Sequence, residues 1–269
     1  MGYFTIIRPV NCLIAFFSVL VGTWIGRHIL FSPPFLIAAM IGFVVCAFGN
    51  VVNDLKDIEI DKINNPTRPL PSGRVDKKIV SLMAILFSVI ALGFSIRLGG
   101  VPFIIVLVTM LLLLVYALYF KKTFWGNFVV ALLTGFSFLF GGAVAKNPVC
   151  FFPFLFSLCI HYTREVIKDV IDIEGDRAVG VNSLPIVFGV ERACHVGALS
   201  LGLLCILLPL PFIFKTLDVP YMAIVLIIAY PMIIYTILRL LKKPVKGELR
   251  TLSNLIKITM VVGLIAMIV

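Results

Sequence analysis

The sequence predicts an all-α, polytopic membrane protein that forms a single domain over residues 1–269. Of the 269 residues, 61% are hydrophobic and only 13% are charged, whereas soluble domains are about 45–50% apolar and about 25% charged. Long stretches contain no charged residue, and a helix of about 20 such residues spans the hydrocarbon core of a bilayer. This composition excludes a soluble enzyme, a nucleic-acid-binding protein and a disordered chain.

Nine transmembrane helices are predicted, and they cover most of the chain. Each is taken from a charge-free stretch, with the last one extended through Lys257. The predicted spans are residues 9–26, 28–53, 79–96, 98–120, 123–145, 147–163, 193–214, 219–238 and about 251–269. The first span has full length and lacks the small-residue cleavage site of a secretory signal, so we expect no cleavable leader.

The Lys and Arg residues are divided unequally between the two sides of the predicted bundle. With a cytoplasmic N-terminus, the cytoplasmic side receives 19 of the 23, and the other side only Arg27, Arg97, Lys146 and Lys215. Cytoplasmic loops of membrane proteins are enriched in Lys and Arg. The sequence therefore predicts a cell-membrane protein with its N-terminus in the cytoplasm and its C-terminus outside.

Carboxylates are concentrated in two connecting segments, residues 54–78 and 164–192, which we expect to be cytoplasmic loops. Together they hold 11 of the 13 Asp and Glu residues. Long connections are uncommon in compact bundles and usually carry function. We therefore expect the active site to face the cytoplasm.

The Asp residues have the same spacing in both segments, which read GNVVNDLKDIEID and REVIKDVIDIEGD. They recur at i, i+3 and i+7, as Asp54, Asp57 and Asp61 in the first segment and as Asp169, Asp172 and Asp176 in the second. Residues at this spacing share one face of a helix over roughly 10 Å. The match predicts two related halves, each with a stripe of carboxylates.

Two such stripes need a cation, because neighbouring carboxylates on a helix repel one another. A solvated acidic face is the alternative, but it is disfavoured beside a membrane, where charged groups are costly to bury. Carboxylate and amide oxygens without a His or Cys cluster are typical ligands of Mg²⁺. Because Mg²⁺ keeps coordination sites for phosphate oxygens, we expect two ions with a diphosphate held between them.

At these motifs the chain resembles the UbiA-type intramembrane prenyltransferases. NDLKDIEID matches the N-D-x-x-D-x-x-x-D signature of that family, and DIEGD matches its second D-x-x-x-D signature. The run from Arg68 to Gly73 and the segment from Tyr116 to Lys121 also match, and the likeness covers essentially the whole chain. The resemblance implies a bundle around a central cavity that transfers a prenyl group from an isoprenyl diphosphate to a lipophilic acceptor.

Cleavage of an allylic carbon–oxygen bond produces a delocalised cation and a diphosphate, so cations near the diphosphate lower the barrier. The predicted metal ligands are Asn50, Asp54, Asp57 and Asp61 for one Mg²⁺ ion and Asp169, Asp172 and Asp176 for the other. The predicted diphosphate contacts are Lys62, Arg68, Lys121 and Arg177, of which Arg68 and Lys121 also match the family pattern. Asn50 and Asn53 of the first motif are also predicted to contact the substrate, and the ring of Tyr116 is a candidate to stabilise the allylic cation.

The segment REVIKDVIDIEGDRAVGVNSLP resembles archaeal family members that add a geranylgeranyl group to geranylgeranylglyceryl phosphate. Because that acceptor carries a phosphate, its site needs additional positive charge. The candidates are Arg8, Lys56, Arg74 and Lys168.

Two alternatives remain at this stage. A prenyltransferase of the same family that acts on an aromatic quinone precursor would need less positive charge. A transporter could also have two related halves, but its site would lie near the bilayer midplane rather than at the ends of spans. The sequence predicts no nucleic-acid partner and gives no oligomeric state.

Overall fold

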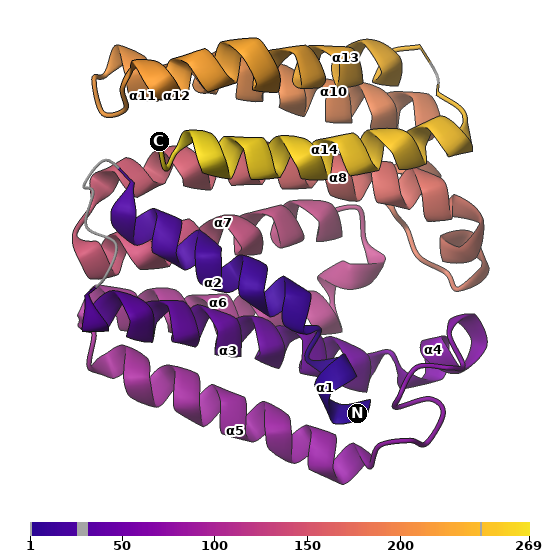
Figure 1. Cartoon of the computed structure of the whole chain (residues 1–269). Coiled ribbons are helices and arrows are strands. Elements are labelled where there is room, and N and C mark those ends of the chain that lie inside the picture. Colours follow the sequence, from indigo (N-terminus) through magenta and orange to yellow (C-terminus); the bar gives the residue numbers. More distant parts are fainter. Residues whose placement is uncertain (1, 26–31, 243) are drawn as a thin grey trace. The chain divides into compact units, whose positions relative to one another are not determined.

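The computed structural model describes residues 2–25, 32–242 and 244–269, which form helices and connecting segments (Figure 1). The α-helices are α1 (Gly2–Ile6), α2 (Pro9–Trp24), α3 (Pro33–Lys56), α4 (Ile58–Asn64), α5 (Lys77–Ile96), α6 (Gly100–Leu118), α7 (Gly126–Ala145), α8 (Phe151–Ala178), α9 (Leu184–Phe188), α10 (Val190–Leu207), α11 (Leu210–Ile213), α12 (Val219–Ile224), α13 (Tyr230–Leu240) and α14 (Lys246–Ala266). Two short 3₁₀ helices, η1 (Phe120–Lys122) and η2 (Pro148–Cys150), precede α7 and α8, and a π-helical segment, η3 (Val225–Ala229), joins α12 to α13. The all-α prediction is confirmed.

Seven segments of the described chain are long and apolar enough to cross a membrane, so the protein is a multi-pass membrane protein. They are Pro33–Lys56, Lys77–Ile96, Gly100–Leu118, Gly126–Ala145, Val190–Ile213, Val219–Leu240 and Lys246–Ala266, and they coincide with seven of the nine predicted spans. The other two predicted spans fall on α2, which has only 16 residues, and on the first half of α8, where charged side chains begin at Arg164. Residues 26–31, which include Arg27, lie outside the described residues.

Large apolar side chains on α5 face outward. Leu82, Ile85 and Val89 follow one another at helical spacing and are all exposed. A continuous apolar face of this kind is stable against lipid and unfavourable in water. This exposure supports the membrane assignment independently of helix length.

The chain divides into two compact units. Unit 1 contains residues 2–23, 32–119 and 136–148, and in it α3 packs against α5 and α6 while α1 contacts α3. Its core is apolar, with Val19 and Val51 among the fully buried residues. Helices α2 and α7 are in backbone contact, because a Cβ at Gly141 would overlap the carbonyl oxygen of Val19. Glycine is required there because its missing side chain permits this close approach.

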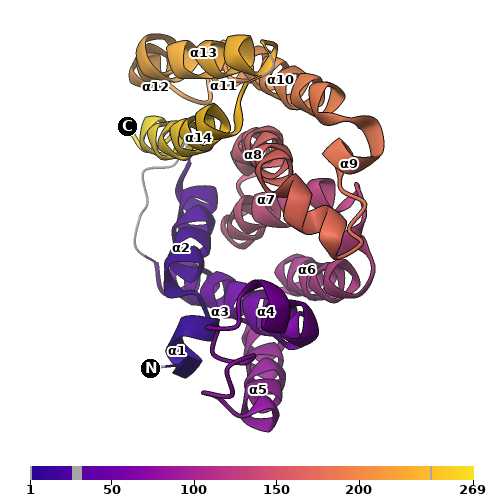
Figure 2. The ribbon, with the colours of Figure 1, turned by 90° about the vertical axis from the view of Figure 1, so that its right-hand side faces the viewer.

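Unit 2 contains residues 24–25, 120–135, 149–242 and 244–269. Helix α8 packs against α10 and α14, and α10 packs against α13, as Figures 1 and 2 show. The segment before α7 is tied to the segment after α8, since the backbone N–H of Asn182 donates to the carbonyl oxygen of Lys122 at 2.9 Å. The ring of Phe124 also packs edge-on against Phe188. These contacts fix the turn that carries Lys121.

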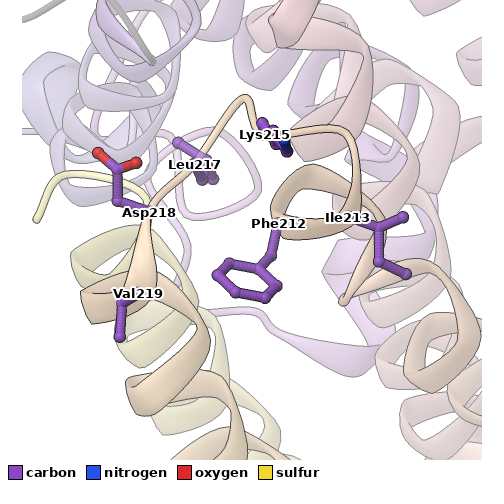
Figure 3. A pocket seen from close by; sticks show the side chains of 6 residues that line it. All are labelled: Phe212, Ile213, Lys215, Leu217, Asp218 and Val219. Atoms are coloured by element: carbon purple, nitrogen blue, oxygen red, sulfur yellow. The ribbon is translucent and has the colours of Figure 1, made fainter.

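A surface hollow of about 450 Å³ lies between α11 and α12 of unit 2 (Figure 3). Its lining residues are Phe212, Ile213, Lys215, Leu217, Asp218 and Val219. Helix α10 lies along the chain between this hollow and the Asp residues of the second Asp segment, residues 164–192. Its 18 residues correspond to about 27 Å of helix. The hollow therefore contains none of the predicted site residues.

Candidate active site

The first Asp segment spans the junction of α3 and α4 in unit 1. Helix α3 ends at Lys56, and Asp57 lies between the two helices with φ −89° and ψ 0°. The backbone N–H of Asp57 still donates to the carbonyl of Asn53 at 2.9 Å, and that of Asp61 to the carbonyl of Asp57 at 2.7 Å. The helical register therefore continues through the junction, as the spacing predicted. The three Asp residues are 6%, 8% and 4% exposed in chain order.

Two of these buried carboxylates are paired with arginines. Arg8 Nη2 lies 2.5 Å from Asp54 Oδ1, and Arg68 Nη1 lies 2.7 Å from Asp61 Oδ2. Burying a carboxylate without a partner is costly, so these cations stabilise the ionised form of the segment. Both arginines were predicted to bind phosphates, and this structure places them on the adjacent carboxylates.

The turn that carries Arg8 is held by Asn50. Arg8 connects α1 to α2 and has a positive φ of 51°, a conformation that non-glycine residues rarely adopt. The Asn50 Nδ2 group donates to the carbonyl of Ile7 at 2.9 Å and thereby fixes the turn. Unlike the Nδ2 group of Asn50, the Oδ1 atom of Asn53 is buried without a hydrogen-bond partner among the described residues.

The second Asp segment is an uninterrupted helix in unit 2. Helix α8 continues to Ala178, so the first part of the expected 164–192 loop is helical. Asp169 accepts a hydrogen bond of 2.7 Å from the Nδ2 group of Asn127 on α7. Asp172 is exposed, and Asp176 is half-buried. The sequence interpretation missed Asn127, although it is an amide next to the basic turn at the start of a predicted apolar span.

Two carboxylates of this segment, Asp169 and Asp176, have raised pKa values. Burial raises the pKa of Asp169 from its usual range to about 7, and the nearby negative charge of Asp176 acts in the same direction. The pKa of Asp176 is raised by burial and by the charge of Asp172. Both shifts show that negative charge is unfavourable here, and a bound cation would relieve this cost.

The remaining predicted residues occupy different environments. Lys168 pairs with Glu165 at 2.7 Å, and Lys62 pairs with the exposed Glu59 at 2.9 Å. Arg177 is exposed, Lys121 lies in η1, and Tyr116 is half-buried on α6. Arg8 and Arg68 thus form ion pairs with the predicted metal ligands Asp54 and Asp61. Lys62 and Lys168 instead form ion pairs with glutamates three residues away in the sequence.

The donor set of each segment suits Mg²⁺, which prefers carboxylate and carbonyl-type oxygens. The buried Oδ1 of Asn53, which has no hydrogen-bond partner in the described part of the chain, adds an oxygen to the first segment. Within the described ranges, however, no three His, Cys, Asp or Glu side chains are grouped closely enough to hold an ion. In the first segment, Asp54 and Asp61 are each directed to a guanidinium, of Arg8 and Arg68 respectively.

Comparison with known proteins identifies the family. Residues 15–258 match the UbiA prenyltransferase family. The chain belongs to this family. As a UbiA prenyltransferase it is an enzyme, and the predicted family is confirmed, whereas the transporter alternative is not supported.

Two relatives are similar to this UbiA prenyltransferase over nearly their full lengths. The digeranylgeranylglyceryl phosphate synthase of Methanocaldococcus jannaschii is 39% identical over 277 residues, covering 99% of this chain and 95% of the relative. The protein of the same name from Methanococcus aeolicus is 37% identical over 271 residues, covering 99% of this chain and 96% of the relative.

Solved structures show the same fold. A structure described as digeranylgeranylglyceryl phosphate synthase in membranes has a TM-score of 0.88 and 36% identity, covering 99% of this chain and 96% of the other. A UbiA homologue from Archaeoglobus fulgidus, bound to GPP and Mg²⁺, has a TM-score of 0.75 and 21% identity over the full length of both chains. At that identity the second likeness is evidence for the fold alone.

Proposed function

We propose that this enzyme transfers a geranylgeranyl group from its diphosphate to the free hydroxyl of geranylgeranylglyceryl phosphate, in a Mg²⁺-dependent reaction. The observation that carries the proposal is the pair of Asp segments with identical spacing in a chain 37% and 39% identical to two synthases of that name. A homologue of the same fold binds GPP and Mg²⁺, and the proposal extends a prenyl diphosphate donor and a Mg²⁺ requirement to this chain.

Two Mg²⁺ ions would be held by the two segments. The proposed ligands are Asn50, Asp54, Asp57 and Asp61 for one ion and Asp169, Asp172 and Asp176 for the other. Asn53 is a further candidate ligand, because its buried Oδ1 accepts no hydrogen bond from the residues that the structure describes. Bound Mg²⁺ neutralises the negative charge that develops on a departing diphosphate.

Basic side chains would bind the phosphate oxygens directly. Arg8 and Arg68 would be available for this role if Asp54 and Asp61 held a cation, and a guanidinium can bind a phosphate through two parallel hydrogen bonds. The further candidates are Lys62, Lys121, Lys168 and Arg177, and Arg8 and Lys168 are proposed for the acceptor phosphate. Tyr116 would face the prenyl cation.

In the reaction, the hydroxyl oxygen of the acceptor forms a bond to the allylic carbon of the donor. The bond from that carbon to the diphosphate oxygen breaks, and its electron pair leaves with the diphosphate. The hydroxyl proton is released, so the products are an ether and inorganic diphosphate. The chain contributes by binding both phosphate groups and by keeping water from the allylic cation.

We further propose the finer membrane arrangement that the sequence predicts. It has nine spans in one domain of two related halves around a central cavity, a cytoplasmic N-terminus, and both Asp segments on the cytoplasmic side. The 19 Lys and Arg residues assigned to that side support this orientation. Cysteine labelling from either side of sealed vesicles would test it at introduced Ser72→Cys and Lys215→Cys, which should label from opposite sides.

The substrate proposal is tested by incubating the purified enzyme with labelled geranylgeranyl diphosphate and a panel of acceptors. We expect an ether-linked glycerophosphate product with geranylgeranylglyceryl phosphate, and no product when Mg²⁺ is chelated. A prenylated hydroxybenzoate or dihydroxynaphthoate as the main product would overturn the proposed acceptor. Full turnover in the presence of a chelator would overturn the proposed role of Mg²⁺.

A further inference from the structure

Asn127 is a buried amide in contact with the second Asp segment. It is the second residue of α7, is 8% exposed, and donates to Asp169 Oδ2 at 2.7 Å. Within the described residues, no Lys or Arg forms an ion pair with Asp169. The residue that holds this carboxylate is therefore a neutral amide.

The first Asp segment is arranged differently. There, Asp54 and Asp61 are held by the cations Arg8 and Arg68. A cation must be displaced before a metal can bind the same oxygen, whereas an amide adds no positive charge and occupies only one carboxylate oxygen. The contact from Asn127 therefore leaves the charge of the ionised Asp169 available to a metal.

The position of Asn127 is fixed by the turn before it. Gly126 approaches the carbonyl oxygen of Phe120 so closely that a Cβ would overlap it. The backbone N–H of Gly126 donates to the carbonyl of Thr123, and the Thr123 hydroxyl donates to the carbonyl of Phe120. This turn also carries Lys121, so one local structure sets both a proposed phosphate contact and the amide on Asp169.

We propose that Asn127 is a positioning residue for magnesium binding at the second Asp segment. Its amide holds Oδ2 of Asp169 and so orients the carboxylate for the metal. The inference rests on the proposed function, because it assumes that Asp169 is a metal ligand. Carboxylates that bind metals are commonly oriented by such outer hydrogen bonds, whose loss typically weakens metal binding by about 10–100-fold.

A purely structural role for Asn127 would be to tie α7 to α8. Another polar contact between these helices exists in the same unit, where Ser157 Oγ lies 3.5 Å from Thr134 Oγ1. Thr134→Val removes that contact without touching Asp169 and is the matched control for Asn127→Leu, which keeps the size of the side chain and removes the donor. Asn127→Gln retains an amide donor on a longer side chain.

Metal binding is measured without substrate by titrating Mn²⁺ into the purified full-length variants and following the electron paramagnetic resonance signal of free Mn²⁺. We expect Mn²⁺ affinity to fall about 10–100-fold in Asn127→Leu, to fall less in Asn127→Gln, and to stay unchanged in Thr134→Val. In transfer assays, the Mg²⁺ concentration for half-maximal rate should rise by a similar factor in Asn127→Leu, and the rate should recover at high Mg²⁺.

Unchanged Mn²⁺ affinity in Asn127→Leu would overturn the inference, and so would an equal loss in Thr134→Val, because that would indicate a general effect of helix packing. Asp172→Ala separates this result from the proposed function. If Asp172→Ala weakens Mn²⁺ binding but Asn127→Leu does not, only the role of Asn127 fails. If neither variant changes binding, the second metal site itself is refuted.

Discussion

The pair formed by Arg8 and Asp54 offers a direct test of how the first segment tolerates buried charge. Arg8→Met keeps an unbranched, flexible apolar stem but removes the cation 2.5 Å from the carboxylate of Asp54. The side chain of Asp54 is 8% exposed, and that of Arg8 is 35% exposed. We expect the variant to be less stable, because a buried carboxylate loses its partner.

The magnitude follows from the geometry. Two unit charges about 4 Å apart attract by about 4 kcal/mol at an effective dielectric constant of about 20. Because one third of Arg8 is exposed, water screens part of this attraction, and we expect a loss of about 2 kcal/mol. For a chain of this size, that corresponds to a fall of roughly 5 °C in the melting temperature.

The assay is thermal unfolding of the purified protein in detergent micelles, and Lys62→Met is the matched control. The pair of Lys62 with Glu59 is exposed on both sides, at 53% and 81%, so its loss should change stability by less than about 1 kcal/mol. Added Mg²⁺ should stabilise Arg8→Met more than the unmodified enzyme, since the carboxylate of Asp54 is already free. If both variants melt at the same temperature, the argument from buried charge is wrong.

Three further predictions concern the second segment and the helix packing. Asp172→Ala should reduce transfer by about 100-fold or more without unfolding the protein, because a developing charge loses its electrostatic stabilisation. Glu174→Ala, which changes a carboxylate of the same helix outside the i, i+3, i+7 stripe, should retain activity. Gly141→Ala should destabilise the protein by about 1–3 kcal/mol in the same unfolding assay, since the new methyl group overlaps Val19; equal stability would contradict the close approach. Because burial raises the pKa of Asp169 to about 7, the metal must displace a proton there, and Mn²⁺ affinity should rise roughly tenfold between pH 6 and pH 8; a fall over this range would refute that reasoning.

Periodicity made the helices and the Asp stripes predictable from the sequence. Charge-free stretches located the long helices, and the i, i+3, i+7 spacing correctly indicated a common helical register for Asp54, Asp57 and Asp61. The change from α3 to α4 at Asp57 was not predictable, because a junction that keeps the register leaves the spacing unchanged.

Contacts between residues far apart in the sequence could not be predicted from such periodic patterns. Arg8 was predicted to bind substrate from its position and charge, but its pairing with Asp54 joins residues 46 positions apart. Asn127 lies 42 positions from Asp169, and a single amide in an apolar stretch has no periodic signal. Such pairs depend on tertiary packing, which local sequence patterns do not encode.

The backbone of Arg8 has a consequence for attempts to stabilise this protein. A residue at φ 51° costs about 1 kcal/mol relative to glycine, so a design procedure guided by backbone preference would replace Arg8 with glycine. That substitution would also remove the guanidinium from Asp54. Arg8 is therefore unfavourable for the backbone conformation at position 8 but favourable for the ion pair with Asp54. When a more stable variant is engineered, residues that combine an unfavourable backbone conformation with a charged contact should be left unchanged.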